Sequence, residues 1–397
     1  MKKVGNWFAA NWMNLAYAVV VAASIVFVLW FGLGDMLPGL SRQEAAQAAS
    51  ADTMRELINN PIGLPHKAVQ FATLQLGNGD GMVRSASALI GLLVLGCFYY
   101  VLRSWYTRRV AILGTLTFAT SAWFLHTARS GTEASMYLLL FGAVACVTWL
   151  QRSRGSIPAV LASALLALIL LYIPGMIWFV VPAILWQLDR ISEIAKGRNP
   201  AILVAISLFV LAALSPIGWA MYQHPDLIKT YFGLPQTMPD PVQVAKNIAH
   251  IPVQLFVRGP DNPALWLGRL PLLNLFTSVM FAIGLYAYAQ NRKLDRVGFA
   301  LFVFVVGGLL ASIGGPVSLT IFLPFVYLIS VSGIALMLQK WFTVFPLNPF
   351  ARSSGTILMT IVVLLAAFNG FSHYFIAWPN TPQTKQVFSP DRRITHP

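Results

Sequence analysis

The stretch NLAYAVVVAASIVFVLWFGL, residues 14–33, decides the class of this protein. It is almost wholly apolar and about 20 residues long, the length that an α-helix needs to cross the hydrocarbon core of a bilayer. Lys2 and Lys3 precede it, as in a secretory signal peptide. A signal core, however, has only about 7 to 15 apolar residues. We therefore expect this segment to be an uncleaved first membrane span.

Ten further apolar segments follow along the chain. They lie near residues 85–102, 109–127, 133–150, 156–172, 174–188, 201–221, 271–289, 297–314, 317–338 and 355–374. Only 10% of all residues are charged, whereas a soluble domain has roughly 25%. The sequence therefore predicts an all-α polytopic membrane protein with about 11 transmembrane helices. These helices would form a single integral-membrane domain over residues 1–397.

The basic residues predict the orientation of the chain. Short loops rich in Lys and Arg mark the cytoplasmic side of a membrane protein. Here they include the N-terminus and residues 103–109, 151–155, 188–198, 290–296 and 339–352. The first outer loop (34–84), the second outer loop (222–270) and the C-terminal tail (375–397) would then be extracytoplasmic. This arrangement accounts for the formal charge of +14. We expect membrane lipids as partners and no nucleic acid.

The first outer loop has the pattern of short helices. Residues 41–59 and 65–77 carry apolar side chains at near-helical spacing, which is typical of amphipathic helices on a membrane surface. Ser41 and Glu44 match the S-x-x-E capping box that begins a helix. The second outer loop is rich in proline and aromatic residues, and we expect an irregular flap.

The C-terminal tail follows the last apolar segment. Tyr374, Phe375 and Trp378 lie close to the end of that segment, and such rings usually anchor a span at the membrane interface. The prolines and charges that come next indicate an extended end, with packing over the outer face left open.

The residues and motifs that the sequence lacks argue against several kinds of chemistry. No span has Lys, Arg, Asp or Glu near its centre, which weighs against an ion-coupled transporter. The sequence has no Walker loop, dinucleotide fingerprint, HExxH or CxxC motif. Cys97 and Cys146 lie inside apolar segments and are expected to be packing residues. His126 lies near the outer end of a span, where we expect a polar rim.

A set of ionisable residues instead gathers at the predicted outer face. It comprises Asp35, Glu44, His66, Lys67, Asp80, Arg84, Arg129 and Glu133. Each has an ordinary structural explanation, such as turn formation, helix capping, or a long basic side chain that reaches the membrane interface. These explanations stay open beside a functional one.

The order of the outer residues resembles the GT-C superfamily of membrane glycosyltransferases. The branch in question contains protein mannosyltransferases and lipid A aminoarabinose transferases. The family's acidic residue in the first outer loop, Lys segment, entry into the second span, and Arg near an acid correspond to Glu44, Lys67, Arg84 with Ser85, and Arg129 with Glu133. Residues 268–274 and 321–338 also look like the C-terminal half of the family. Gln43-Glu44 stands where relatives have an Asp-Glu pair.

The resemblance implies transfer of a sugar, with inversion, from a polyprenyl-phosphate-linked donor to an extracytoplasmic glycan, lipid or protein. It implies that Glu44 is the catalytic base and that Lys67, Arg84 and Arg129 bind the donor phosphate. Asp35, His66 and Glu133 would contact the acceptor or a metal. The resemblance leaves a divalent metal open and requires no certain cofactor.

Two other functions remain alternatives. The protein could be a transporter of lipid or polysaccharide, in which an outer pocket binds without reacting. It could also be a catalytically inactive GT-C-like scaffold, because Gln43 replaces the expected Asp.

Overall fold

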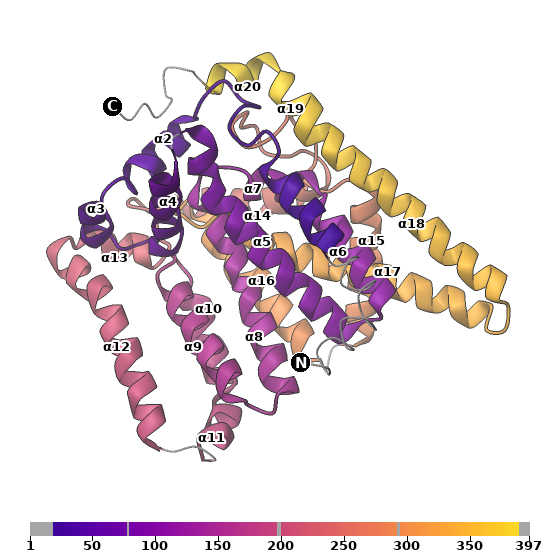
Figure 1. Cartoon of the computed structure of the whole chain (residues 1–397), viewed down its shortest axis with the longest axis horizontal. Coiled ribbons are helices and arrows are strands. Elements are labelled where there is room, and N and C mark those ends of the chain that lie inside the picture. Colours follow the sequence, from indigo (N-terminus) through magenta and orange to yellow (C-terminus); the bar gives the residue numbers. More distant parts are fainter. Residues whose placement is uncertain (1–18, 78, 197–199, 292–293, 389–397) are drawn as a thin grey trace, which may run out of the picture.

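The structure is a computed structural model that describes residues 19–77, 79–196, 200–291 and 294–388. Lys2, Lys3 and the first five residues of the predicted first span therefore lie outside the described residues. Figure 1 shows a bundle of long helices with the short helices α2, α3 and α4 gathered at one end and α11 at the other. We call the first of these the outer end, following the orientation that the sequence predicts.

All eleven predicted apolar segments fall on helices. The first described helix is Val19–Trp30. The others are α5 (Asp80–Trp105), α6 (Arg108–Ala119) with α7 (Ala122–Ala128), η1 (Glu133–Leu139) with α8 (Leu140–Arg152), α9 (Ile157–Leu171), α10 (Ile177–Trp186), α12 (Pro200–Gln223), α15 (Leu275–Gln290), α16 (Asp295–Ser312), η2 (Leu319–Phe322) with α17 (Leu323–Val344), and α18 (Pro349–Phe371). The charged α11 (Leu188–Lys196) lies between α10 and α12.

The length and apolar composition of these helices determine how many of them could each cross a membrane as a single continuous helix. In the described part of the chain, 6 are long and apolar enough, or 7 if the pair α6 and α7, bent by 63°, forms one span. Val19–Trp30, α9, α10 and α15 are apolar but shorter, at 10–17 residues. The predicted class, an all-helical polytopic membrane protein, is confirmed.

The first outer loop folds into the short helices that its pattern predicts. They are α2 (Arg42–Ala49), α3 (Met54–Asn59) and α4 (Leu64–Leu76). The capping box of α2 is present. The Glu44 N–H donates to Ser41 Oγ at 3.2 Å, and the Ser41 N–H donates to the Glu44 carboxylate at 3.0 Å. Of these helices, α4 packs against α5, and α2 and α3 pack against α4.

The second outer loop is not the irregular flap that its composition indicates. It contains α13 (Asp226–Tyr231) and the 16-residue α14 (Pro241–Phe256). The prediction was wrong because proline is compatible with the first turn of a helix, where its missing N–H would have no partner. Pro241 occupies that turn. The helix packs along α16.

The C-terminal tail is helical where an extended chain was expected. A π-helical turn, Ser372–Ala377, continues α18, and α19 (Trp378–Asn380) and α20 (Pro382–Val387) follow. Residues 389–397 lie outside the described residues. Figure 1 shows this tail returning over the end of the bundle that carries α2.

Two glycines allow α15 and α17 to pack closely in the core. A Cβ atom on Gly284 would lie 1.9 Å from the Ile329 carbonyl oxygen, and one on Gly333 would lie 2.1 Å from the Met280 carbonyl oxygen. Small residues at such crossings let helix backbones approach, which is a main source of packing energy between helices in lipid.

Gly333→Ala should therefore destabilise the protein, because the added methyl group meets a backbone oxygen that cannot move without separating α15 from α17. A loss of about 1–3 kcal/mol is expected from overpacking. Thermal unfolding in detergent measures it. Gly96→Ala in α5 is the control, since a Cβ there meets nothing within 4 Å. Equal unfolding temperatures for the two variants would contradict this account of the crossing.

Candidate functional site

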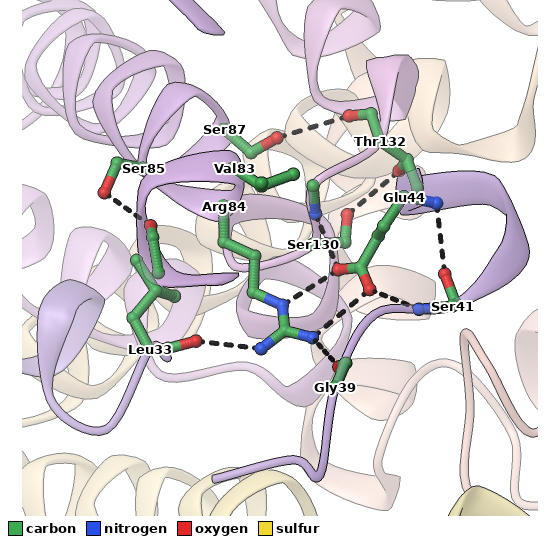
Figure 2. A network of polar contacts seen from close by, with 12 residues as sticks. Leu33, Gly39, Ser41, Glu44, Val83, Arg84, Ser85, Ser87, Ser130 and Thr132 are labelled. Atoms are coloured by element: carbon green, nitrogen blue, oxygen red, sulfur yellow. Dashed lines mark hydrogen bonds and ion pairs between the residues drawn. The ribbon is translucent and has the colours of Figure 1, made fainter. Parts of the chain in front are cut away.

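The carboxylate of Glu44 is the centre of a buried polar network at the outer end of the bundle (Figure 2). Oε1 accepts from Arg84 Nε at 2.9 Å and from the Gly131 N–H at 2.9 Å. Oε2 accepts from the Ser41 N–H at 3.0 Å and from an Arg84 terminal nitrogen at 3.2 Å. A carboxylate has about four lone-pair sites. In this conformation all of them are occupied.

The electrostatics of Glu44 follow from these contacts. Burial alone would raise the pKa of the carboxyl group. The charge and hydrogen bonds of Arg84, with the N–H groups of Gly131 and Ser41, outweigh burial and leave the pKa below its usual value. Glu44 is therefore held as a carboxylate, with no free lone pair for a further proton.

Arg84 uses four of its five guanidinium N–H donors within the protein. Besides Glu44, it donates to the carbonyl oxygens of Leu33 at 3.0 Å and Gly39 at 2.8 Å. Because these oxygens follow the first helix, Arg84 ties the start of α5 to the chain between that helix and α2. Its predicted phosphate-binding role would require some of these bonds to break.

Arg129 ends α7 and caps the first helix. Its terminal nitrogens donate to the carbonyl oxygens of Val28 and Phe31. Its guanidinium lies over the rings of Tyr374 and Phe375, at 5.2 Å and 4.8 Å from their centroids. Basic groups are favourable at such helix ends because they pair with carbonyls that lack helical partners. Its Nε has no hydrogen-bond partner.

Glu44, Arg84 and Arg129 line one small cavity, together with Tyr374, Trp378 and Phe388 from the tail and further residues that include His126, Ser130 and Thr132. Its volume is about 10 Å³, near the minimum that holds a single water molecule. The tail therefore closes the place where the three predicted residues meet.

Tyr374 and Trp378 do not serve as the predicted interface anchors. They are buried and pack with Trp266 around His126, whose ring centroid lies 4.8 Å from Tyr374, 4.5 Å from Trp378 and 4.9 Å from Trp266. The prediction failed because the tail turns back over the bundle, so the rings reach a protein surface. His126 accordingly lies in an aromatic cluster and not on an open rim.

His66, Lys67 and Glu133 form a second group beside the first. Lys67 Nζ donates to the Asn60 carbonyl oxygen at 3.0 Å. Lys67 and Glu133 meet at Gly63, where a Cβ atom would lie 3.1 Å from a Glu133 carboxylate oxygen and 3.8 Å from Lys67 Cε. Burial lowers the pKa of Lys67, although Glu133 and Glu56 act in the opposite direction. The loop 129–133 joins this group to the Glu44 network.

The remaining predicted residues lie apart from these groups. Asp35 is exposed in the turn after the first helix, and Asp80 is buried at the start of α5. Within the described ranges, no three His, Cys, Asp or Glu side chains come together as metal ligands. Asp35, His66 and Glu133 are thus not brought to a common centre with Glu44.

Several residues of the site were missed by sequence reasoning. Trp266, His373 and Phe388 come from segments far along the chain, and Phe388 lies 5.7 Å from the Arg84 guanidinium. The dense aromatics of residues 371–378 were the one available signal. They were assigned to the membrane interface instead.

The comparisons with known proteins agree with this architecture. No family model matches the sequence, and no curated protein matches it. Similar solved structures include ArnT from Cupriavidus metallidurans in the apo state, with a TM-score of 0.53, 15% identity, and coverage of 94% of this chain and 77% of that one. The chain has the ArnT fold. The same protein bound to undecaprenyl phosphate gives a TM-score of 0.51, 14% identity, and coverage of 93% and 76%.

ArnT is an aminoarabinose transferase of the GT-C superfamily, so the fold implied by the sequence resemblance is confirmed. The match to the ArnT fold covers 94% of this chain. At such low identity the likeness establishes the fold, and the roles of individual residues rest on the contacts described above.

Glu44→Gln should destabilise the protein strongly, because it leaves Arg84 buried without its counter-charge. Removing one partner of a buried ion pair typically costs about 3–5 kcal/mol. Asp261→Asn is the control, since Asp261 and Arg269 form an ion pair whose side chains are 69% and 59% exposed, and such pairs contribute about 0–1 kcal/mol. Thermal or denaturant unfolding in detergent compares the two. A loss for Glu44→Gln no larger than the control would show that the pair does not hold the fold.

His66 should make the protein less stable in mild acid. Burial, with the nearby charge of Lys67, lowers the pKa of His66 from 6.5 to about 3. Its Nε2 lies 3.0 Å from Ser87 Oγ, and its Nδ1 has no partner to receive a second proton. The neutral ring therefore stabilises the fold above about pH 6.5, and this contribution falls by about 1.4 kcal/mol per pH unit as the pH drops toward 3.

Unfolding temperatures at about pH 7.5 and pH 5 test this effect. The wild type should lose stability between them, and His66→Gln should lose clearly less. His250→Gln, at an exposed position of α14, should behave like the wild type. If His66→Gln retains the full acid sensitivity, the sensitivity arises elsewhere.

Proposed function

We propose that this protein is a membrane glycosyltransferase that transfers a sugar from a polyprenyl-phosphate-linked donor to an extracytoplasmic acceptor. The observation that carries the proposal is the ArnT fold over 94% of the chain. A structure of ArnT bound to undecaprenyl phosphate shares that fold. The residues that resemble the GT-C motifs also gather at one end of the bundle, which supports a common site.

The proposed reaction is a single displacement. The acceptor hydroxyl oxygen attacks the anomeric carbon of the sugar, and the bond from that carbon to the donor phosphate breaks. The electron pair of that bond leaves with the polyprenyl phosphate, and the configuration at the carbon inverts. A carboxylate takes the hydroxyl proton, and positive side chains stabilise the negative charge that develops on the phosphate.

We assign the base to Glu133, and Glu44 becomes a positioning residue. Glu44 could accept a proton only if Arg84 or a backbone N–H first left it. Glu133 is half-buried, and the structure shows it in no hydrogen bond or ion pair with another described residue. It also follows the loop that binds Glu44 through Gly131. A base sheltered from bulk water and free of donors suits proton transfer.

Lys67 is the proposed contact to the donor phosphate. Its ammonium group has three N–H donors, and the structure shows one bond, to the Asn60 carbonyl oxygen. A phosphate beside it would favour the charged form that burial disfavours. Arg129 Nε, which has no partner, offers a second donor.

The cavity that Glu44, Arg84 and Arg129 line, next to the Lys67 and Glu133 group, would admit a donor or acceptor only after movement of the tail. The cavity of about 10 Å³ admits neither a sugar nor a phosphate group. Trp378 and Phe388 form part of its wall. The segment from Trp378 to Phe388 would therefore move away when donor or acceptor binds, while the Glu44–Arg84 pair stays in place.

One observation favours a second candidate function, a catalytically inactive scaffold. Gln43, at the position of the family's Asp, is exposed on α2, and Glu44 has no free lone pair. Such a protein would still bind a polyprenyl phosphate and place it for a partner.

Turnover of polyprenyl-phosphate sugars by the purified protein tests both functions. Glu133→Gln should lower the rate by about 10²-fold or more, as expected for loss of a general base, with little change in unfolding temperature. Glu193→Gln, an exposed acid on α11, is the control and should keep the wild-type rate. Glu44→Gln should lose stability, and its rate per folded molecule should exceed that of Glu133→Gln.

Two results would overturn parts of this proposal. Turnover that survives in Glu133→Gln but not in folded Glu44→Gln returns the base to Glu44. Wild-type protein that binds polyprenyl phosphate but turns over no donor with any envelope acceptor is the scaffold.

A further inference from the structure

A separate cavity lies at the other end of the bundle from the Glu44 network. It has a volume of about 390 Å³, within the roughly 300–1,000 Å³ range of ligand pockets. α8, α10 and the start of α16 form its walls, and Trp105 at the end of α5 closes one side. α5 has 26 residues and thus separates this cavity from Arg84 by about the thickness of a bilayer, at 1.5 Å per residue.

The walls of the cavity are mostly apolar, and its mouth lies among side chains that a bilayer would cover. Phe299, Phe302 and Val147 line the cavity. Trp186 and Leu294 form part of its lining and are 60% and 41% exposed. Exposed Trp residues at the ends of spans are typical of the interface between hydrocarbon and headgroups. An acyl chain that enters between α8, α10 and α16 would find an apolar channel there.

Arg296 is the basic residue of this cavity. Its guanidinium lies over Trp105, Tyr106 and Tyr288, at 5.4 Å, 5.8 Å and 6.0 Å from the ring centroids. Such stacking uses the faces of the guanidinium group and leaves its N–H edge free for in-plane hydrogen bonds. Its Nε is buried without a partner. Asp295 beside it forms no ion pair with it in the described chain.

The surroundings of Arg296 favour an anion. Arg296 lies in the first turn of the 18-residue α16. The backbone N–H groups of a first helical turn point out of the N-terminal end of the helix, which favours an anion there. The connections next to the cavity are basic and include Arg103, Arg108, Arg109, Arg152 and Arg154. Asp295 is the one acidic residue among those that line the cavity, and it is exposed at the rim.

From these observations we infer that the cavity is a binding site for an anionic phospholipid of the leaflet next to the basic loops. The phosphate would accept hydrogen bonds from the free edge of Arg296, and an acyl chain would lie between Phe299, Phe302 and α8. The arrangement matches both parts of such a lipid. The stacked Arg296 suits the phosphate, and the apolar channel suits the acyl chain. The inference does not depend on sugar transfer at the outer end.

Lipid-dependent stability tests the inference on delipidated protein in detergent. Phosphatidylglycerol should raise the unfolding temperature with a saturable midpoint, whereas phosphatidylcholine should need a concentration at least tenfold higher. Inorganic phosphate should have no such effect, since it lacks the acyl chain. Equal effects of the two lipids, or an equal effect of phosphate alone, would overturn the proposal.

Variants locate the effect within the molecule. Arg296→Gln should weaken the response to phosphatidylglycerol about tenfold or more. Arg352→Gln, which removes another arginine stacked on a ring, 5.2 Å from the Phe342 centroid, should leave it unchanged. Ala183→Trp fills the cavity from α10 with Arg296 intact and should also abolish the response. A response that persists in either folded variant, Ala183→Trp or Arg296→Gln, would overturn the site. If one of the two fails to fold, the other still provides the test.

Discussion

The buried ion pair between Glu44 and Arg84 is the interaction on which the outer end of the molecule depends. Its two side chains are 3% and 2% exposed, so each would be costly to bury alone. Their bonds reach α2, the start of α5, the turn at 33–39 and the loop 129–132. One pair thus joins three stretches that are distant in sequence, namely residues 33–49, the start of α5 and the loop 129–132.

This network also explains why a residue type that suits catalysis need not be the catalyst. The capping box that predicts the start of α2 uses one oxygen of Glu44, and Arg84 and Gly131 use the remaining sites. A carboxylate that holds a fold through four donors cannot take a proton without weakening that fold. The roles of anchor and base are therefore separated more easily between Glu44 and Glu133 than combined in one side chain.

The sequence predicts more of the fold than of the site. Apolar segments of span length, and the S-x-x-E signal at Ser41, depend on neighbouring residues and are visible locally. The partner of Glu44 is 40 positions away, and nothing in the local pattern selects Arg84 over Lys67 or Arg129. The prediction for the aromatic tail failed for a related reason, because the same rings can pack at a membrane interface or against a protein surface. Only the direction in which the chain turns after Phe371 decides between them.

Arg84 on α5 and Arg296 on α16, which stacks on Trp105 at the far end of α5, show how one residue type serves two purposes. At the outer end, Arg84 donates two hydrogen bonds to Glu44 and two to backbone oxygens, so most of its N–H donors serve to hold the fold. At the other end, Arg296 is held by the faces of three rings, and its Nε has no partner. Stacking fixes a cation without using its hydrogen bonds, whereas ion pairing fixes it by using them. An arginine that can bind a ligand therefore differs from one that holds the fold by its unpaired N–H donors. The positive charge alone does not distinguish the two.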